Sequence, residues 1–201
     1  MYKRQGIDCD LGEASVQIAS DSYSIGELAT RRLFDDGCSR ILCLRSNSRM
    51  RMPANKRTDA YLDVVEQAGL SALVREVEFV KPDDEKGAVV AKILDENPDI
   101  DGIFAGDDTM AAICLNVMKQ RGLSAPGDIK VVGADGARRT MTFMPDLTTV
   151  RQDIDRIGEL AAQSIIALIN GEKPESNIKL PVELIELSLI HISEPTRLQL
   201  I

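Results

Sequence analysis

The sequence predicts an α/β fold in which parallel β-sheets are flanked by helices. Short apolar segments of strand length alternate along most of the chain with longer segments whose apolar residues recur at helical spacing. Four helical segments end at a glycine, namely Gly37, Gly69, Gly122 and Gly171, and glycine is the preferred residue just after a helix. Because strands joined through helices run parallel, the alternation predicts a parallel sheet covered on both faces.

The first half of the chain is expected to hold two helices and two strands. Asp21 can cap a helix because its side chain accepts hydrogen bonds from free backbone N–H groups, and Ile25, Leu28 and Leu33 then share one face. The segment 45–54, rich in Arg, Ser and Met, is expected to be a loop. In order, the expected elements are a helix between Asp21 and Gly37, a strand at 41–44, a helix carrying Tyr61 that ends at Gly69, and a strand at 74–80.

The second half continues the same alternation. Proline fits the start of a helix, so we expect one to begin at Pro82 and Asp83. In order, the further expected elements are a strand at 100–105, a helix capped by Asp107 or Asp108 and ending at Gly122, a strand at 129–134, a long loop at 135–147, a strand at 148–152, a helix from Ile154 to Gly171, and a strand at 178–185. Ligands bind outside the carboxyl ends of parallel strands, so Arg45, Asp107 and Asp135 are candidate site residues.

Composition and charge exclude several classes of protein. Apolar residues make up 44% of the chain, which excludes a disordered protein. Aromatic residues are only 3%, so a platform that stacks single-stranded nucleic acid is excluded. The formal net charge of −8 repels phosphate backbones, so this part of the protein is not expected to bind DNA by itself. No apolar run is long enough to span a membrane, and we expect no membrane partner.

The cysteines and the missing motifs argue against a metal site or an enzyme. Cys9, Cys38, Cys43 and Cys114 form neither a CxxC pair nor a metal-ligand spacing. Scattered free thiols are typical of the reducing cytoplasm, and Cys43 and Cys114 lie in apolar segments that predict a core position. The sequence holds no P-loop, GxSxG or GxGxxG motif. We therefore expect no cofactor, no metal ion and no enzymatic activity.

The two ends of the chain resemble foreign sequence. The run Leu187–Arg197 resembles an in-frame translation of a transposase-based sequencing adapter, and Met1–Gln5 resembles the other adapter strand. We leave residues 1–5 and 187–201 out of fold reasoning and expect that neither end packs on the domain. The only histidine, His191, then falls outside the native protein, so histidine-based catalysis is not expected. The alternative is that the last segment is a natural amphipathic tail.

Several longer motifs carry a specific resemblance. They are VVGADG at 131–136, MPDLTTVRQD at 144–153, FAGDDTMA at 104–111, the Gly122–Ile129 loop with Pro126, Asp21 with Gly26, and Arg57 with Tyr61. In this order and spacing they resemble the effector-binding core of LacI/GalR transcription regulators. The resemblance covers residues 6–186, and the block from 131 to 152 is its most specific part.

The resemblance implies a periplasmic-binding-protein-like type I fold with one lobe complete and one partial. Residues 6–34 and 152–177 would form the partial N-terminal lobe. Residues 35–151 would form the C-terminal lobe, completed by 178–186. The chain would be truncated at the N-terminus, since nothing in it matches the DNA-reading headpiece of the family. DNA would then be a partner only through that missing headpiece, and the full-length protein would be a homodimer.

The resemblance also implies the site residues for a sugar-like small-molecule effector. The ligand-gripping arginine of the family falls on Arg57, whose guanidinium can donate to two oxygens of a sugar at once. The late-strand carboxylate falls on Asp135, which can accept from sugar hydroxyls. Asp107 stands where the family has asparagine. Asp21 and Gln152 match positions near the cleft and the crossover between lobes, where a helix cap or a structural hydrogen bond explains each residue equally well.

Two departures from the family pattern and the distribution of charge leave the identity of the effector open. Ala60 replaces the glycine of the family, and Pro82 lies near the position of an aromatic residue that stacks on sugars in some members. Arginines that could flank the cleft favour an anionic sugar, whereas Asp21, Asp107 and Asp135 favour a neutral or amino sugar. The arginines are Arg45, Arg49, Arg51, Arg138 and Arg139.

Two functions other than the sensing core of a regulator could use the same sequence features. A secreted sugar-binding protein of an ABC importer would share the fold, but the PDLTTVRQD block and the unpaired thiols favour the regulator. An enzyme could use Asp107 and Asp108 as acid–base carboxylates. Adjacent residues at a helix start point apart, however, so helix capping explains this pair better.

Overall fold

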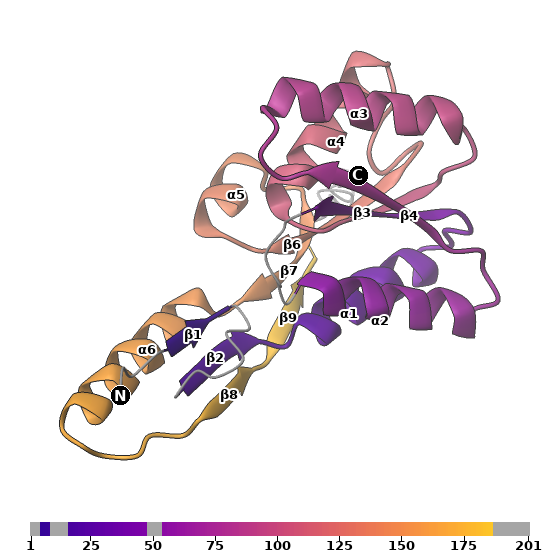
Figure 1. The fold of residues 1–201 in the computed structure, drawn as a ribbon. Coiled ribbons are helices and arrows are strands. Elements are labelled where there is room, and N and C mark those ends of the chain that lie inside the picture. Colours follow the sequence, from indigo (N-terminus) through magenta and orange to yellow (C-terminus); the bar gives the residue numbers. More distant parts are fainter. Residues whose placement is uncertain (1–4, 9–15, 48–53, 187–201) are drawn as a thin grey trace, which may run out of the picture.

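The structure, a computed structural model, describes residues 5–8, 16–47 and 54–186. These residues form two lobes that lie end to end (Figure 1). The large lobe is built on a six-stranded sheet and the small lobe on a three-stranded sheet. The segments that resemble adapter sequence lie outside the described residues, with the exception of Gln5. Within the described part of the chain, no helix combines the length and the hydropathy needed to cross a membrane.

The six strands of the large sheet run parallel except at one edge. In spatial order they are β4 (Leu73–Glu78), β3 (Ile41–Asn47), β5 (Gly102–Ala105), β6 (Lys130–Asp135), β7 (Thr148–Gln152) and β9 (Val182–Ile185). Only β9 is antiparallel to its neighbour, β7. The carboxyl ends of β3, β5, β6 and β7 therefore meet at one edge of the sheet, where an α/β fold places its ligand.

Helices cover both faces of this sheet. Helices α1 (Ser22–Asp35) and α2 (Ala54–Gln67) lie on one face, and α3 (Asp83–Glu96) and α4 (Asp108–Gln120) lie on the other (Figure 1). Side chains alternate between the faces of a strand. In β3, Ile41 and Cys43 accordingly join the core beneath α1 and α2, whereas Leu42 and Leu44 join the core beneath α3 and α4. The buried cysteines Cys43 and Cys114 are core residues, as the sequence predicts.

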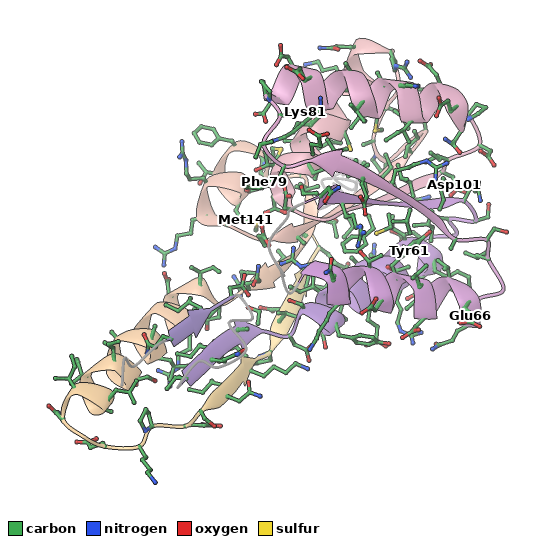
Figure 2. The ribbon with its side chains drawn as sticks, viewed as in Figure 1. Tyr61, Glu66, Phe79, Lys81, Asp101 and Met141 are labelled. Atoms are coloured by element: carbon green, nitrogen blue, oxygen red, sulfur yellow. The ribbon has the colours of Figure 1, made fainter. Side chains whose placement is uncertain are left out.

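Tyr61 fastens α2 to the sheet. Its ring is fully buried between the helix and the strands (Figure 2). Its hydroxyl donates to the Ile41 carbonyl oxygen at 2.7 Å and accepts from the Leu73 backbone N–H at 2.8 Å. A buried hydroxyl with both roles satisfied fixes the helix more specifically than apolar contact alone. This anchor sets the position of the first turn of α2, which carries Arg57.

The small lobe is a parallel three-stranded sheet with one helix. The strands β1 (Gln5–Ile7), β2 (Val16–Ser20) and β8 (Asn177–Leu180) pair in the order β1–β2–β8, and α6 (Ile154–Ile169) packs on them. Val16 and Ile18 of β2 form its core with Ile157 and Leu168 of α6. Strands β1 and β2 were not expected from the sequence. Gln5 was expected not to pack, but it pairs with Val16, and its side-chain amide donates to the Ala161 carbonyl oxygen at 3.0 Å.

The chain passes between the lobes three times. The passages lie at Asp21, at Asp153 and at Pro181. The Asp21 backbone N–H donates to the Leu180 carbonyl oxygen at 2.9 Å, which ties the first passage to the third. Three adjacent connections of this kind can serve as a hinge, because a few residues at element ends can absorb a rotation of one lobe against the other.

Two lobe boundaries differ from those expected. Helix α1 was expected to belong to the N-terminal lobe through residue 34, but its buried residues Ile25, Ala29 and Leu33 join the core of the large lobe. The boundary therefore lies at Asp21. The single strand expected at 178–185 is broken at Pro181, which has no N–H to continue a ladder. Its first part, β8, belongs to the small lobe, and its second part, β9, belongs to the large one.

The loop expected at 135–147 contains a short helix, α5 (Arg138–Phe143). None of its residues is buried, and no side chain caps its first residue. The sequence therefore shows neither the apolar periodicity nor the cap by which the longer helices are recognised.

Candidate functional site

Three candidate residues meet at the carboxyl edge of the large sheet. Arg57 reaches this edge from the first turn of α2, Asp135 ends β6, and Gln152 ends β7. The guanidinium Nη2 of Arg57 lies 3.1 Å from Oδ1 of Asp135. The side-chain amide of Gln152 donates to the same oxygen at 2.6 Å. The structure thus brings together a donor-only, an acceptor-only and an amide group beside the second passage between the lobes.

Burial makes this arrangement rigid while leaving the carboxylate accessible. Arg57 is only 8% exposed, and its Nη1 donates to the Gly106 carbonyl oxygen, which follows β5. Gln152 is 6% exposed, whereas the Asp135 side chain keeps 35% of its surface exposed. A ligand hydroxyl can therefore reach Asp135 while the guanidinium and the amide hold it from behind.

The carboxyl group of Asp135 titrates well above its ordinary range. Its pKa is raised to about 6, chiefly by burial and also by the negative charges of Asp107 and Asp108, while the Arg57 guanidinium opposes the rise. About a third of the side chain still meets solvent, yet neighbouring protein atoms crowd the oxygens enough for desolvation to dominate. Such a carboxylate gains from any hydrogen-bond donor that a ligand supplies in place of water.

The backbone at this point is held in an uncommon conformation. Asp135 has a φ of 104°, in the region that favours glycine, and Gly136 follows with a φ of 59°. A Cβ atom on Gly136 would lie 2.6 Å from Cβ of Arg151, so the turn after β6 has no room for another residue type. Strained backbone of this kind persists only where the surroundings determine it, and it concentrates at functional sites.

Asp107 caps a helix and contributes its charge to the site from one side. Its Oδ1 accepts from the Met110 backbone N–H at 2.8 Å, and its Oδ2 accepts from the Ser46 hydroxyl at 3.3 Å. The first contact makes Asp107 the N-cap of α4, as the sequence allows. The charge of Asp107 also raises the pKa of Asp135, so the two carboxylates are electrostatic neighbours.

Asp21 lies at the first passage between the lobes and is engaged there. Its side chain accepts from the Ser24 backbone N–H at 3.2 Å, which makes it the N-cap of α1. Its other oxygen lies 2.7 Å from the Lys179 ammonium of β8, and the two contacts together lower its pKa against the effect of burial. These contacts make Asp21 a helix cap and an ion-pair partner, and a contact of Asp21 with a ligand stays a prediction.

Asp108 lies next to the candidate site through contacts that the sequence did not predict. It is only 3% exposed and accepts from the Thr149 hydroxyl at 2.6 Å and from the Gly136 backbone N–H at 2.9 Å. The adjacent pair Asp107–Asp108 was visible in the sequence, and capping accounts for one member only. The unexplained second carboxylate in the first turn of a helix was the available signal.

Two of the three described arginines that were expected to flank the site have acidic partners, whereas Arg139 of α5 has none among the described residues. Arg45 pairs with Glu76 of the neighbouring strand, and Arg138 lies 2.6 Å from Asp155 of α6. Arg49 and Arg51 lie outside the described residues. The described charges near Arg57 are therefore largely compensated by partners within the protein.

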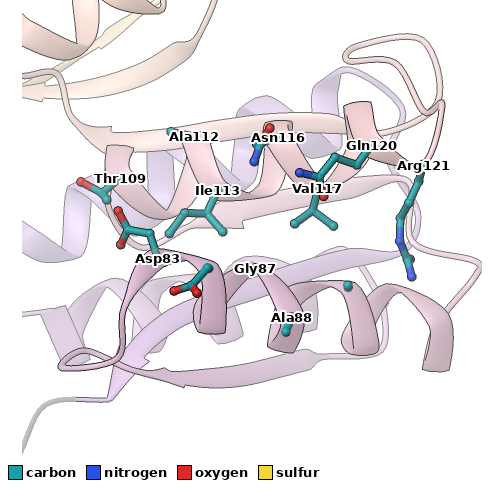
Figure 3. Close-up of a pocket in the computed structure, with 12 residues that line it drawn as sticks. Asp83, Gly87, Ala88, Thr109, Ala112, Ile113, Asn116, Val117, Gln120 and Arg121 are labelled. Carbon is teal, nitrogen blue, oxygen red and sulfur yellow. The ribbon is translucent and has the colours of Figure 1, made fainter.

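Two cavities adjoin the large lobe. A cavity of about 640 Å³ lies between α3 and α4, lined by residues such as Gly87, Ala88 and Ala112 (Figure 3). It includes neither Arg57 nor Asp135 and lies away from the charged cluster. A second, of about 860 Å³, borders the passages between the lobes and includes Gln152 and Gly136. Only the second touches the candidate site.

The fold and the site together define a two-lobed ligand-binding domain. Two α/β lobes are joined by three adjacent passages, and paired donor and acceptor groups stand at the carboxyl strand ends beside them. The chain belongs to the periplasmic binding protein-like domain family, whose profile matches residues 30–186. The expected fold class is thereby confirmed.

Similar proteins include sugar-operon repressors. The sucrose operon repressor of Lactococcus lactis is 31% identical over 83% of this chain and 51% of its own length. The ribose operon repressor of Halalkalibacterium halodurans is 32% identical over 78% of this chain and 46% of its own length. The structure of a LacI family transcriptional regulator from Arthrobacter sp. FB24 in complex with lactose is 26% identical, with a TM-score of 0.80 over 92% of this chain and 70% of that one.

These matches confirm the resemblance to LacI/GalR regulators. The chain spans about half the length of the curated relatives it matches. What it shares with them is the ligand-binding core.

Proposed function

We propose that this chain is the effector-sensing core of a LacI/GalR-type transcription regulator and that it binds a sugar-like small molecule between its lobes. The observation that carries the proposal is the Arg57–Asp135–Gln152 network beside the passages between the lobes. Arg57 only donates, Asp135 only accepts, and a sugar hydroxyl does both. The lactose complex of the Arthrobacter regulator, which has the same fold, supports a sugar as the ligand class.

We propose that the sugar acts by drawing the lobes together. A ligand that contacts both lobes binds the closed form better and shifts the population toward it. In the full-length regulator, a cytoplasmic homodimer, this closure would reach a DNA-binding headpiece. The net charge of −8 makes phosphate contact by the core itself unfavourable, so DNA is a partner only through the headpiece. The proposal includes no enzymatic step and no cofactor.

Charge compensation favours a neutral sugar over an anionic one. Arg57 is already paired with Asp135, and Arg45 is already paired with Glu76. A sugar phosphate would have to compete with Asp135 for the guanidinium and would meet the charge of Asp107 nearby. A neutral hydroxyl can instead donate to the exposed part of the Asp135 carboxylate without breaking the ion pair.

The importer alternative has weaker support. Its fold is the same, but the similar curated proteins are operon repressors rather than transport proteins. We therefore keep the regulator as the single proposed function.

The proposal is tested by calorimetric titration of the chain with sucrose, ribose, lactose and glucose 6-phosphate. We expect a neutral sugar to bind, and Arg57→Ala and Asp135→Ala each to weaken it about ten- to a hundredfold, or about 1.5–3 kcal/mol. Arg31→Ala is the matched control, because Arg31 pairs with Glu27 on the exposed face of α1, and it should leave affinity unchanged. Absence of binding by all four compounds, or full affinity in both site variants with unchanged melting, would contradict the proposal.

A further inference from the structure

A buried carboxylate, Asp108, stands directly beneath the turn that presents Asp135. It follows the N-cap of α4 and is 3% exposed. One oxygen accepts from the Thr149 hydroxyl of β7 at 2.6 Å, and the other accepts from the Gly136 backbone N–H at 2.9 Å. This one side chain therefore links the first turn of α4, the middle of β7 and the end of β6.

The surrounding chain leaves room for this carboxylate. A Cβ atom on Gly133 of β6 would lie 2.5 Å from Oδ1 of Asp108, so only glycine fits there without displacing the carboxylate. Thr149 is fully buried, and its hydroxyl has Asp108 as its partner. Charged groups are rarely buried unless donors meet them. Burial raises the pKa of Asp108, and hydrogen bonds from the Thr149 hydroxyl and from the backbone N–H groups of Ala137 and Gly136 offset only part of that rise.

The position of the Gly136 contact gives Asp108 a role beyond stability. Gly136 follows Asp135 directly, and Asp135 holds its φ of 104° only while the turn is fixed. Arg151 packs against Gly136 from one side, and Asp108 binds its N–H from another. Loss of the second contact would let the turn relax and move the Asp135 carboxylate relative to Arg57.

We propose that Asp108 is a positioning residue that fixes the turn after β6 through Gly136 and Thr149 and so sets the place of Asp135 in the site. The inference rests on the proposed function for its biological meaning, because Asp135 is the acceptor for the sugar. Its physical content concerns the chain without any ligand, and it can be tested separately.

The experiment is nuclear magnetic resonance of the chain and of Asp108→Ala, in the absence of any sugar. Alanine removes both acceptor oxygens, so the Gly136 N–H loses its side-chain partner. We expect hydrogen exchange of the Gly136 amide to become at least about tenfold faster, as the loss of a charge-assisted hydrogen bond implies. The pKa of Asp135 should fall in this variant simply because a neighbouring negative charge is lost, so that shift does not report position.

Asp101→Ala is the matched control. Asp101 also accepts from backbone N–H groups, those of Ser39 and Arg40, both at 2.8 Å. It precedes β5 and lies at the other end of the large lobe from Phe79, which follows β4 (Figure 2). The control should lower stability without changing Gly136 exchange or the Asp135 titration, which shows that neither change follows from a loss of stability alone.

A second variant separates position from charge and keeps the test decisive if Asp108→Ala does not fold. Thr149→Val removes one donor to Asp108 but keeps the shape of its own side chain and the Asp108 carboxyl group. It should give faster Gly136 exchange, though less than in Asp108→Ala, and a shifted Asp135 titration. Thr149→Ser restores the hydroxyl and should reverse both changes. Unchanged Gly136 exchange in the variant that folds, or an unchanged Asp135 titration in Thr149→Val, would overturn the inference. A sugar that fails to bind would count against the proposed function alone.

Discussion

Asp101 and Asp135 stand at opposite ends of the same sheet, and their carboxyl groups are shifted in opposite directions. At the amino end, burial alone would raise the pKa of Asp101, but hydrogen bonds from Ser39 and Arg40 outweigh it and lower that pKa. At the carboxyl end, burial and neighbouring negative charge raise the pKa of Asp135 to about 6 in spite of Arg57. The Asp101 carboxylate at the amino end has its hydrogen-bond donors within the protein. The Asp135 carboxylate at the carboxyl end can accept further hydrogen bonds from a ligand.

Asp101 at the amino end of the sheet therefore serves stability, whereas Asp135 at the carboxyl end serves the proposed binding. Enzymes and receptors accept local instability where they need a prepared site, and the rest of the fold offsets it. Variants at the two ends should therefore separate folding from ligand affinity.

Gly26→Ala should be the most damaging single substitution near the site. A Cβ atom at Gly26 would lie 2.1 Å from the Arg57 carbonyl oxygen, and backbone cannot move aside as a flexible side chain can. We expect a loss of about 3 kcal/mol in the free energy of unfolding, measured by urea denaturation. Gly158→Ala in α6 is the control, because no atom lies within 4 Å of its added Cβ. That variant should be neutral or stabilised by up to about 1 kcal/mol. Equal effects of the two substitutions would show that α1 does not pack on α2 as described.

Asp101→Asn should lower stability by about 1–2 kcal/mol, because the amide nitrogen cannot accept from Ser39. The lowered pKa means that this contribution is fully present above the ordinary pKa of 3.8 and is lost as pH falls through the folded-state value. Urea denaturation at pH 7 and at pH 3 measures both effects. A variant as stable as the wild type at pH 7 would show that the hydrogen bonds of Asp101 do not stabilise the fold.

Asp135→Asn should have the opposite dependence on pH. A raised pKa means that the folded state binds the proton more tightly, so ionisation of Asp135 costs stability above about 6, and this cost disappears as pH falls toward 4. We expect the wild type to gain from this group between pH 7 and pH 5 and the variant to lack that gain. Sugar affinity of the wild type should fall over the same interval, since a protonated carboxyl is a poorer acceptor. An affinity independent of pH between 7 and 5 would count against Asp135 as the acceptor.

The exposed ion pair between Arg138 and Asp155 should matter least. It joins α5 of the large lobe to α6 of the small lobe at 2.6 Å, but both side chains are mostly in solvent. Exposed pairs contribute little, so Arg138→Ala should change the free energy of unfolding by less than about 0.5 kcal/mol, and less still in high salt. A larger loss in urea denaturation would indicate that the pair fixes the angle between the lobes.

Sequence patterns predicted the long elements well because local signals were strong there. The strand at 148–152 has the predicted bounds, and Asp21 and Asp107 cap the helices that they were expected to cap. The short α5 was missed because it has no buried residue and no capping side chain. The break at Pro181 sends two halves of one apolar run to different lobes, a long-range effect that period and propensity do not encode.

The members of the candidate site could be proposed from the sequence, but their contacts could not. The family resemblance pointed to Arg57, Asp135 and Gln152, and the structure joins all three through one carboxylate oxygen. Resemblance alone could not show that Asp21 is engaged by Lys179, because that contact depends on β8, distant in sequence. It also could not show the support beneath Asp135, since the Thr149 and Gly136 contacts of Asp108 arise only when three elements meet.

The most direct test of Asp135 as the sugar acceptor is the titration of its carboxyl group by nuclear magnetic resonance. The titration is followed with and without the sugar that binds most tightly. We expect a midpoint of about 6 for Asp135 in the free chain and a midpoint below 3.8 for Asp101 of the same sample. We also expect bound sugar to lower the Asp135 midpoint, because hydroxyl donors favour the charged form, and to leave the Asp101 midpoint unchanged. An Asp135 midpoint at the ordinary value of 3.8, or one that saturating sugar does not change, would contradict the role of Asp135 as the acceptor.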